Sequence, residues 1–137
     1  MDDGKERVIE RETLLEAEPE RVWEALTDES LLADWFADGA RIDPWEGGEV
    51  EFECEDGERR GTVQRIDAER ELAFTWARRG EGESLVRFTL EPVEYGTRLV
   101  VVERAVAGQV AAALAPQFAW TRRLRALELC VGSLVLA

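Results

Sequence analysis

Histidine is absent from all 137 residues of this sequence. Catalytic triads built on an imidazole base, histidine-rich zinc sites and imidazole switches near neutral pH are therefore excluded. Catalysis would have to rely on carboxylates, the single tyrosine Tyr95, a cysteine or bound water. We expect no metal and no cofactor, and the sequence favours a binding protein over an enzyme.

Cysteines and long apolar runs are also scarce. Cys54 and Cys130 lie in different expected elements, which is typical of two free buried thiols in a reducing compartment. No stretch approaches the roughly 20 apolar residues that span a bilayer, and the acidic start at residues 1–6 is unlike a secretory signal. We therefore expect a cytoplasmic protein that does not bind membranes.

Basic side chains are outnumbered, since 17 Lys and Arg face 30 Asp and Glu, for a formal net charge of −13. A field of this sign repels phosphate backbones, so nucleic acid is excluded as a partner. Residues 1–58 carry 21 of the 30 acidic side chains. We interpret this bias as an acidic solvated surface, and a basic partner or self-association is the alternative.

The sequence contains enough hydrophobic residues to form one hydrophobic core. Hydrophobic residues make up 45% of the chain, which includes five Trp and five Phe. The length lies within the usual size of one domain. We expect a single domain over residues 1–137, with residues 1–6 disordered.

The first third predicts a strand and two short helices. Apolar and polar side chains alternate over residues 7–17, which predicts a strand. Pro19 is suited to the first turn of a helix. Asp28 is a candidate N-cap of a second helix, which Gly39 is expected to close.

The middle of the chain predicts an antiparallel meander. Glutamates alternate with Val50, Phe52 and Cys54, so one face of that strand is wet and the other dry. Asp56-Gly57 is a hairpin signal, and further turns separate alternating strands at residues 59–66, 70–78, 84–91 and 97–104.

The last third predicts one long amphipathic helix. Pro116 is placed to open it, and Gly132 to end or bend it. Its apolar positions recur at spacings of four, three and four: Trp120, Leu124, Leu127 and Val131. The fold class is therefore α+β, with a curved antiparallel sheet of about six to seven strands and a long C-terminal helix across its concave face.

Short motifs then occur in a suggestive order: Val22-Trp23-Glu24-Ala25-Leu26-Thr27-Asp28, Trp35-Phe36, Gly47-Gly48, Phe74-Thr75-Trp76, Gly96-Thr97-Arg98-Leu99 and Trp120. This order resembles proteins similar to the activator of the ninety-kilodalton heat-shock protein ATPase. That family belongs to the START-like, or helix-grip, superfamily (SRPBCC), with polyketide cyclases, lipid-transfer domains and birch-pollen-type allergens. The resemblance implies a helix-grip fold with a cavity between sheet and helix that commonly takes an apolar small molecule.

The candidate ligand-binding residues are mostly apolar side chains expected to face that cavity: Trp35, Phe52, Phe74, Trp76, Phe88, Val101, Glu103, Phe118, Trp120 and Leu124. The alternative is that these side chains simply fill the core. An empty apolar void of ~300 Å³ would cost ~7 kcal/mol by extrapolation from measured cavity costs, so either the side chains or a ligand must occupy the space.

Glu103 continues the parity of Leu99 and Val101, which would point it inward as a polar anchor or an acid. Because unpaired buried carboxylates are costly, the favoured interpretation is that the strand ends at Val102 and Glu103 reaches solvent or an arginine. Arg122, Arg123 and Arg125 are likewise interpreted as a solvated face, with recognition of an acidic group as the alternative. The apolar segment 110–115 is either a lid or a packed turn.

The leading hypothesis is a small-molecule-binding protein, a monomer or homodimer, that holds an apolar or amphipathic ligand. One alternative is a cyclase- or hydrolase-like enzyme that uses a cavity carboxylate such as Glu103. The other is a co-chaperone-like interaction domain.

Overall fold

The computed structural model describes residues 8–106 and 117–136, although the side chains of 117, 118 and 132–136 are outside this description. The elements follow the order β1 (Val8–Leu15), α1 (Pro19–Thr27), α2 (Glu29–Trp35), β2 (Gly39–Ile42), β3 (Glu49–Cys54), β4 (Gly57–Asp67), β5 (Glu71–Arg78), β6 (Ser84–Val93), β7 (Gly96–Ala105) and α3 (Gln117–Leu136). The segments 1–6 and 110–115, for which disorder and a lid or turn are expected, lie outside the described residues.

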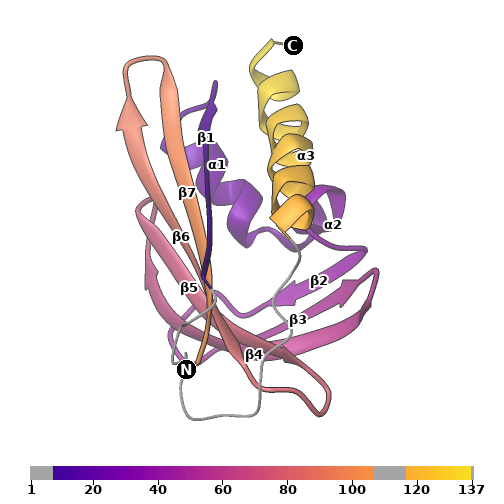
Figure 1. Cartoon of the computed structure of the whole chain (residues 1–137). Coiled ribbons are helices and arrows are strands. Elements are labelled where there is room, and N and C mark those ends of the chain that lie inside the picture. Colours follow the sequence, from indigo (N-terminus) through magenta and orange to yellow (C-terminus); the bar gives the residue numbers. More distant parts are fainter. Residues whose placement is uncertain (1–7, 107–116, 137) are drawn as a thin grey trace, which may run out of the picture.

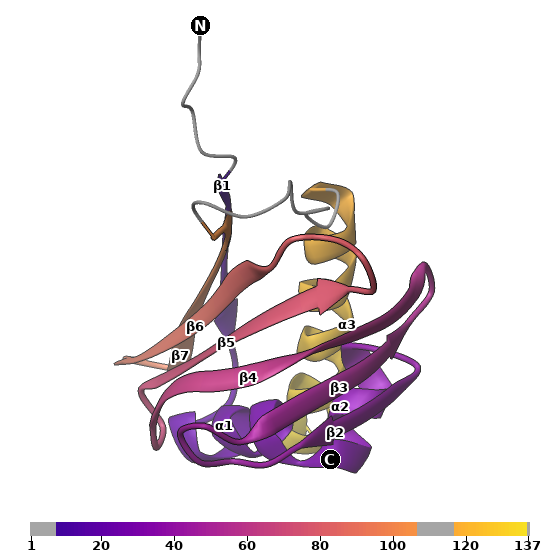
Figure 2. The same cartoon turned by 90° about the horizontal axis from the view of Figure 1, so that it is seen from below.

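The seven strands form one antiparallel sheet in the order β1-β7-β6-β5-β4-β3-β2. This curved sheet and the long helix α3 across its concave side make the expected helix-grip fold (Figure 1). Seen from below, the strands cross in front of α3, and α2 lies beside β2 (Figure 2). The α+β class and the sheet of six to seven strands are confirmed.

The shortest strand, β2, was not predicted, and its first residue corrects the expected end of α2. The helix ends at Trp35, with Phe36 as its C-cap, and Gly39 begins β2 opposite Glu53. A Cβ at residue 39 would lie 3.2 Å from the carboxylate of Glu53, an exposed side chain that can move aside, so space alone does not require glycine there. Gly39 is therefore a residue of strand β2 and not the stop of helix α2.

The predicted cap of α2 is confirmed. The carboxylate of Asp28 accepts hydrogen bonds from the backbone N–H groups of Ser30 and Leu31, at 2.9 and 3.1 Å. The Ser30 hydroxyl donates to the same oxygen at 2.7 Å. The Ser30 side chain, followed by the Leu31 backbone, lowers the pKa of Asp28 below its ordinary value of 3.8. The helix start is therefore held by a carboxylate that prefers its charged form.

We expect this cap to weaken in acid. Because the folded pKa of Asp28 is depressed, its contribution to stability is present above about pH 4 and is lost as the pH falls through the folded value. Asp28→Asn keeps an acceptor at the cap but cannot titrate. Urea unfolding across the acid range should show a smaller decline in stability for the variant, and equal declines would contradict this role.

The polar and apolar faces of the sheet follow the alternation in the sequence. Val50 and Phe52 are each 1% exposed, whereas Glu49 and Glu53 are exposed. In β4 the register shifts between Val63 and Arg65, a β-bulge that adds one residue. This bulge explains how Val63 and Ile66, three residues apart, can both serve the apolar face.

Helix α3 supplies the cover of the concave face. Its predicted apolar stripe of Trp120, Leu124, Leu127 and Val131 is buried in the main core cluster. The helix continues through Gly132 to Leu136, so the glycine does not end it. Within residues 8–106 and 117–136, no helix is long and apolar enough to cross a bilayer.

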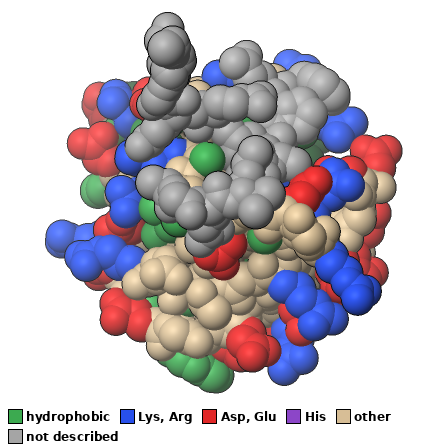
Figure 3. Space-filling model, turned by 60° about the horizontal axis from the view of Figure 1, so that its bottom comes forward, with side chains coloured by type: hydrophobic (Ala, Val, Ile, Leu, Met, Phe, Trp, Pro, Cys, Tyr) green, Lys and Arg blue, Asp and Glu red, His purple; other side chains and the backbone are tan. Residues whose placement is uncertain are grey.

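The acidic and basic parts of the sequence meet on the surface. Glu12 pairs with Arg98 at 3.3 Å, and Glu55 pairs with Arg122 at 3.5 Å. Acidic and basic side chains lie close together around the face shown in Figure 3. Exposed pairs of this kind contribute little to stability, but they place basic side chains of the second half of the sequence beside acidic ones of the first half.

Candidate functional site

The space between the sheet and α3 is occupied by a cluster of aromatic rings centred on Phe36. Phe36 is 3% exposed, and its ring lies 4.8 Å from that of Phe52 and 5.5 Å from that of Trp76, centroid to centroid. Four further rings lie within 6.4 Å of it: Trp35, Phe74, Phe88 and Trp120. Tilted and edge-to-face contacts of this kind stabilise an apolar core beyond the area that they bury.

Glu103 lies at the end of this cluster and is 0% exposed. The interpretation that its strand stops at Val102 is wrong, because β7 continues to Ala105 and the inward parity persists. The indole N–H groups of Trp76 and Trp120 each donate to the carboxylate at 2.9 Å, one to each oxygen. The Ser84 hydroxyl donates to the first of these oxygens at 2.6 Å. Burial is tolerated because the carboxylate accepts these bonds.

This network has the geometry of an anchor. An indole N–H can only donate, so Trp76 and Trp120 occupy acceptor positions on both oxygens of Glu103. The donors come from β5, β6 and α3, and the acceptor comes from β7. Glu103 therefore ties the long helix to three central strands. Across the part of the chain that the structure describes, no cluster of acidic or sulfur side chains could hold a metal ion.

Arg123 approaches the same cluster from α3. Its Nε donates to the backbone carbonyl of Phe36 at 3.0 Å, and its Nη2 lies 3.9 Å from the sulfur of Cys54. The guanidinium carbon is 4.9 Å from the ring centroids of both Phe36 and Trp120. Arg122 and Arg125 are exposed, as the solvated interpretation expects, but Arg123 is half-buried and corrects it.

Burial shifts the pKa values of both Arg123 and Cys54. It lowers the pKa of Arg123, which the neighbouring Cys54 and Glu103 partly oppose, and a guanidinium still remains charged at neutral pH. Burial also raises the pKa of the Cys54 thiol, against the opposing effect of Arg123 and Arg59. Neither Cys54 nor Cys130 forms a disulfide, as expected, but both are only partly buried. Arg123 is therefore a cation that lies beside the neutral thiol of Cys54.

A hollow of about 340 Å³ opens beside Arg123, between the end of α2, the end of β3 and the middle of α3. We call it the α2–α3 opening. Trp35 and Phe36 line it and also belong to the aromatic cluster, so the opening reaches the edge of the core. The remaining lining is small apolar or charged: Ala33, Asp34, Ala37, Asp38, Cys54, Glu55, Arg122, Arg123 and Ala126. Its volume is near the lower end of the range for small-molecule sites.

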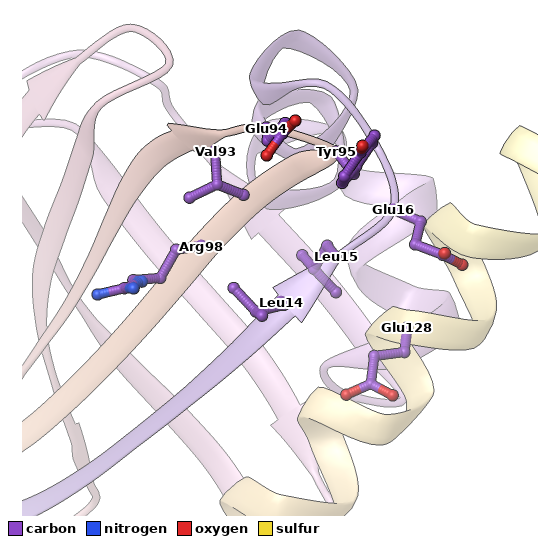
Figure 4. A pocket seen from close by; sticks show the side chains of 8 residues that line it. All are labelled: Leu14, Leu15, Glu16, Val93, Glu94, Tyr95, Arg98 and Glu128. Carbon is purple, nitrogen blue, oxygen red and sulfur yellow. The ribbon is translucent and has the colours of Figure 1, made fainter.

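A second hollow, of about 600 Å³, lies at the end of edge strand β1 (Figure 4). Leu14 and Leu15 both line it, yet successive residues of a strand point to opposite faces of a sheet. Leu14 lies opposite Arg98 in the strand register and is 63% exposed, whereas Leu15 is 2% exposed. This hollow therefore wraps around a sheet edge, and the α2–α3 opening is the better candidate site.

Nine of the ten candidate residues lie together in the core between sheet and helices: Trp35, Phe52, Phe74, Trp76, Phe88, Val101, Glu103, Trp120 and Leu124. The tenth, Phe118, is in α3, and its side chain lies outside the described residues. Sequence reasoning missed Phe36, Ser84 and Arg123 as members of the site. The even parity of Val86, Phe88 and Leu90 was a signal for Ser84.

Searches of solved structures found similar folds over nearly the whole chain. Protein MLL2253 from Mesorhizobium loti is 21% identical, with a TM-score of 0.78 over 93% of this chain and 98% of that chain. CalU16 from Micromonospora echinospora is 20% identical, with a TM-score of 0.70 over 96% and 88%. The Aha1 dimer from Colwellia psychrerythraea is 18% identical, with a TM-score of 0.72 over 91% and 96%. Identities this low show the shared fold alone.

No match to a curated protein was found. A family model, by contrast, matches residues 16–132, a range that begins just after β1, ends within α3 and includes the aromatic cluster, Glu103 and Arg123. The match covers most of the chain and agrees with the resemblance in the sequence motifs. The chain belongs to the family of Activator of Hsp90 ATPase homolog 1-like proteins.

Proposed function

We propose that this protein binds an apolar or amphipathic small molecule between the sheet and α3, with the α2–α3 opening as its entrance. The observation that carries the proposal is that Trp35 and Phe36 belong both to the lining of the opening and to the aromatic cluster. A molecule seated there contacts the core without crossing the sheet. The fold family commonly binds ligands, which supports the same function.

Phe36 is the side chain that such a ligand displaces. It follows directly after α2 as the C-cap, at the border between the opening and the other rings. Because an empty apolar void is costly, the rings pack together until a ligand replaces the contacts of Phe36. The deeper candidate residues, among them Phe74, Trp76 and Phe88, then form the floor of the site.

An enzyme that uses Glu103 is the less favoured function. A general acid or base must be within hydrogen-bond reach of the proton that it moves. The oxygens of Glu103 already accept from two indoles and one hydroxyl, and the side chain is 0% exposed. These contacts support an anchoring role.

Blocking the entrance tests the proposal. We expect wild-type protein to bind naphthamide, a neutral bicyclic aromatic, in calorimetric titrations. Ala33→Trp places a large side chain at an exposed position of the lining and should weaken binding about tenfold or more. Leu129→Trp, at an exposed position on α3 outside the lining, is the matched control and should bind as the wild type does.

A second measurement looks for the natural ligand. Native mass spectrometry of protein purified from its own host should show a retained small mass that Ala33→Trp reduces. Equal naphthamide affinity in the wild type and in Ala33→Trp would place binding elsewhere, and no binding to the wild type would remove the proposed function.

A further inference from the structure

We propose that the α2–α3 opening selects ligands whose apolar body carries one anionic oxygen group, and that this group binds Nη1 of Arg123. The inference rests on the proposed function and names the ligand class of the same site. The neutral part of the ligand would take the place of Phe36 against the rings. The anionic group would then lie at the entrance.

The hydrogen bonds of Arg123 point to this group. A guanidinium has five N–H donors in a fixed plane. Nε donates to the Phe36 carbonyl, and Nη2 has a sulfur atom at 3.9 Å, which is a weak acceptor. Nη1 is buried, and among the described residues it has no hydrogen-bond partner. A buried donor without a partner is rare in native proteins and calls for an acceptor from elsewhere.

The guanidinium of Arg123 lies mainly against aromatic rings. Two aromatic rings, Phe36 and Trp120, lie against its guanidinium, and burial lowers its pKa. The buried carboxylate of Glu103, which accepts the indole N–H of Trp120, partly opposes this lowering. Cation–π contacts are attractive, but they leave the donors in the guanidinium plane available. A desolvated cation at the wall of a hollow is suited to an anionic oxygen.

The rim of the opening limits how much charge a ligand can carry. Asp34, Asp38 and Glu55 also line the hollow, and all three are exposed. Glu55 lies 3.5 Å from Arg122, which offsets part of its charge. The other two carboxylates would repel a phosphate or another multiply charged anion. A single carboxylate or phenolate on an apolar body fits the cation and this rim together.

The test compares two probes of the same shape, naphthoate and its neutral isostere naphthamide, by calorimetric titration. We expect the wild type to bind naphthoate more tightly than naphthamide, although the net charge of −13 repels anions in general. Arg123→Met keeps an apolar stem and removes the charged group. Arg123→Met should lower the affinity for naphthoate about tenfold or more and change the affinity for naphthamide less than about twofold.

Two further variants keep the test decisive. Arg125→Met removes the same charge from an exposed position of α3 outside the lining, so it should leave both affinities unchanged. Arg123→Lys retains the charge without the planar fork and should lose part of the naphthoate preference. Near-ultraviolet circular dichroism checks the packing of each variant, and the wild-type comparison of the two probes stands even if a variant fails to fold.

The outcomes separate the two proposals. If naphthamide binds and naphthoate binds no more tightly, or if Arg123→Met weakens both equally, the ligand class is overturned while the proposed function stands. If Arg125→Met weakens naphthoate binding as much as Arg123→Met does, the preference for naphthoate comes from the overall charge of the protein. The proposed ligand class is then also overturned. If neither probe binds the wild type, both proposals fail.

Discussion

Glu103→Ala should lower the free energy of unfolding by about 3–5 kcal/mol, because it leaves the buried donors of Trp76, Ser84 and Trp120 without their acceptor. It also removes the link between β7 and α3. Glu103→Gln keeps the shape but turns an N–H₂ group toward one of these donors, so an intermediate loss is expected. Urea unfolding followed by tryptophan fluorescence measures both.

The matched control for this change is Glu94→Ala. Glu94 is exposed in the turn between β6 and β7, and surface substitutions of this kind usually stay within about 0.5 kcal/mol. A loss below about 1 kcal/mol for Glu103→Ala would contradict the anchoring role. Such a result, together with loss of a catalysed reaction, would favour the enzyme hypothesis instead.

Phe36→Ala should cost about 3–5 kcal/mol, the usual range for truncating a buried phenylalanine. The ring contacts six other aromatic rings, so the variant leaves an apolar void at the centre of the cluster. Apolar voids stay dry and can bind benzene. We therefore expect benzene to raise the melting temperature of the variant and to leave that of the wild type nearly unchanged.

Tyr95→Ala is the control for this truncation, because Tyr95 is 82% exposed and its loss should change stability little. A stable Phe36→Ala protein that gains nothing from benzene would show that the site collapses without the ring. Phe36 would then not be the side chain that a ligand replaces.

The strands were predictable because a period of two is visible wherever one face is wet. Val86, Phe88 and Leu90 illustrate this, since each is buried and each alternates with a more exposed neighbour. Strand β2 was missed because it has only four residues and a single buried apolar side chain, Ile42. Its position depends on pairing with β3, which the local sequence does not encode.

The environment of Glu103 could not be predicted for a different reason. The parity of β7 pointed the side chain inward, but the cost of burying a carboxylate argued against it. That cost is offset by donors from residues 76, 84 and 120, which only the folded chain brings together. The alternation in β7 therefore predicted the direction of the side chain, but not the partners that make this direction favourable.

Arg123 shows where a closer use of helical spacing would have helped. It lies three residues after Trp120 and four before Leu127, so it borders the apolar stripe of α3 on the same face. Arg122 and Arg125 lack this relation to the stripe and are exposed. The aliphatic part of an arginine can lie along apolar surface while its charged end reaches a boundary.

The most direct test of the binding site is the response of the five tryptophan indole N–H resonances to naphthoate in two-dimensional NMR. Trp35 lines the α2–α3 opening and Trp120 contacts Arg123, whereas Trp45 is 58% exposed in the turn before β3. The account predicts saturable shifts of the Trp35 and Trp120 signals with Trp45 unmoved. Unchanged Trp35 and Trp120 signals at a naphthoate concentration that saturates binding would contradict it.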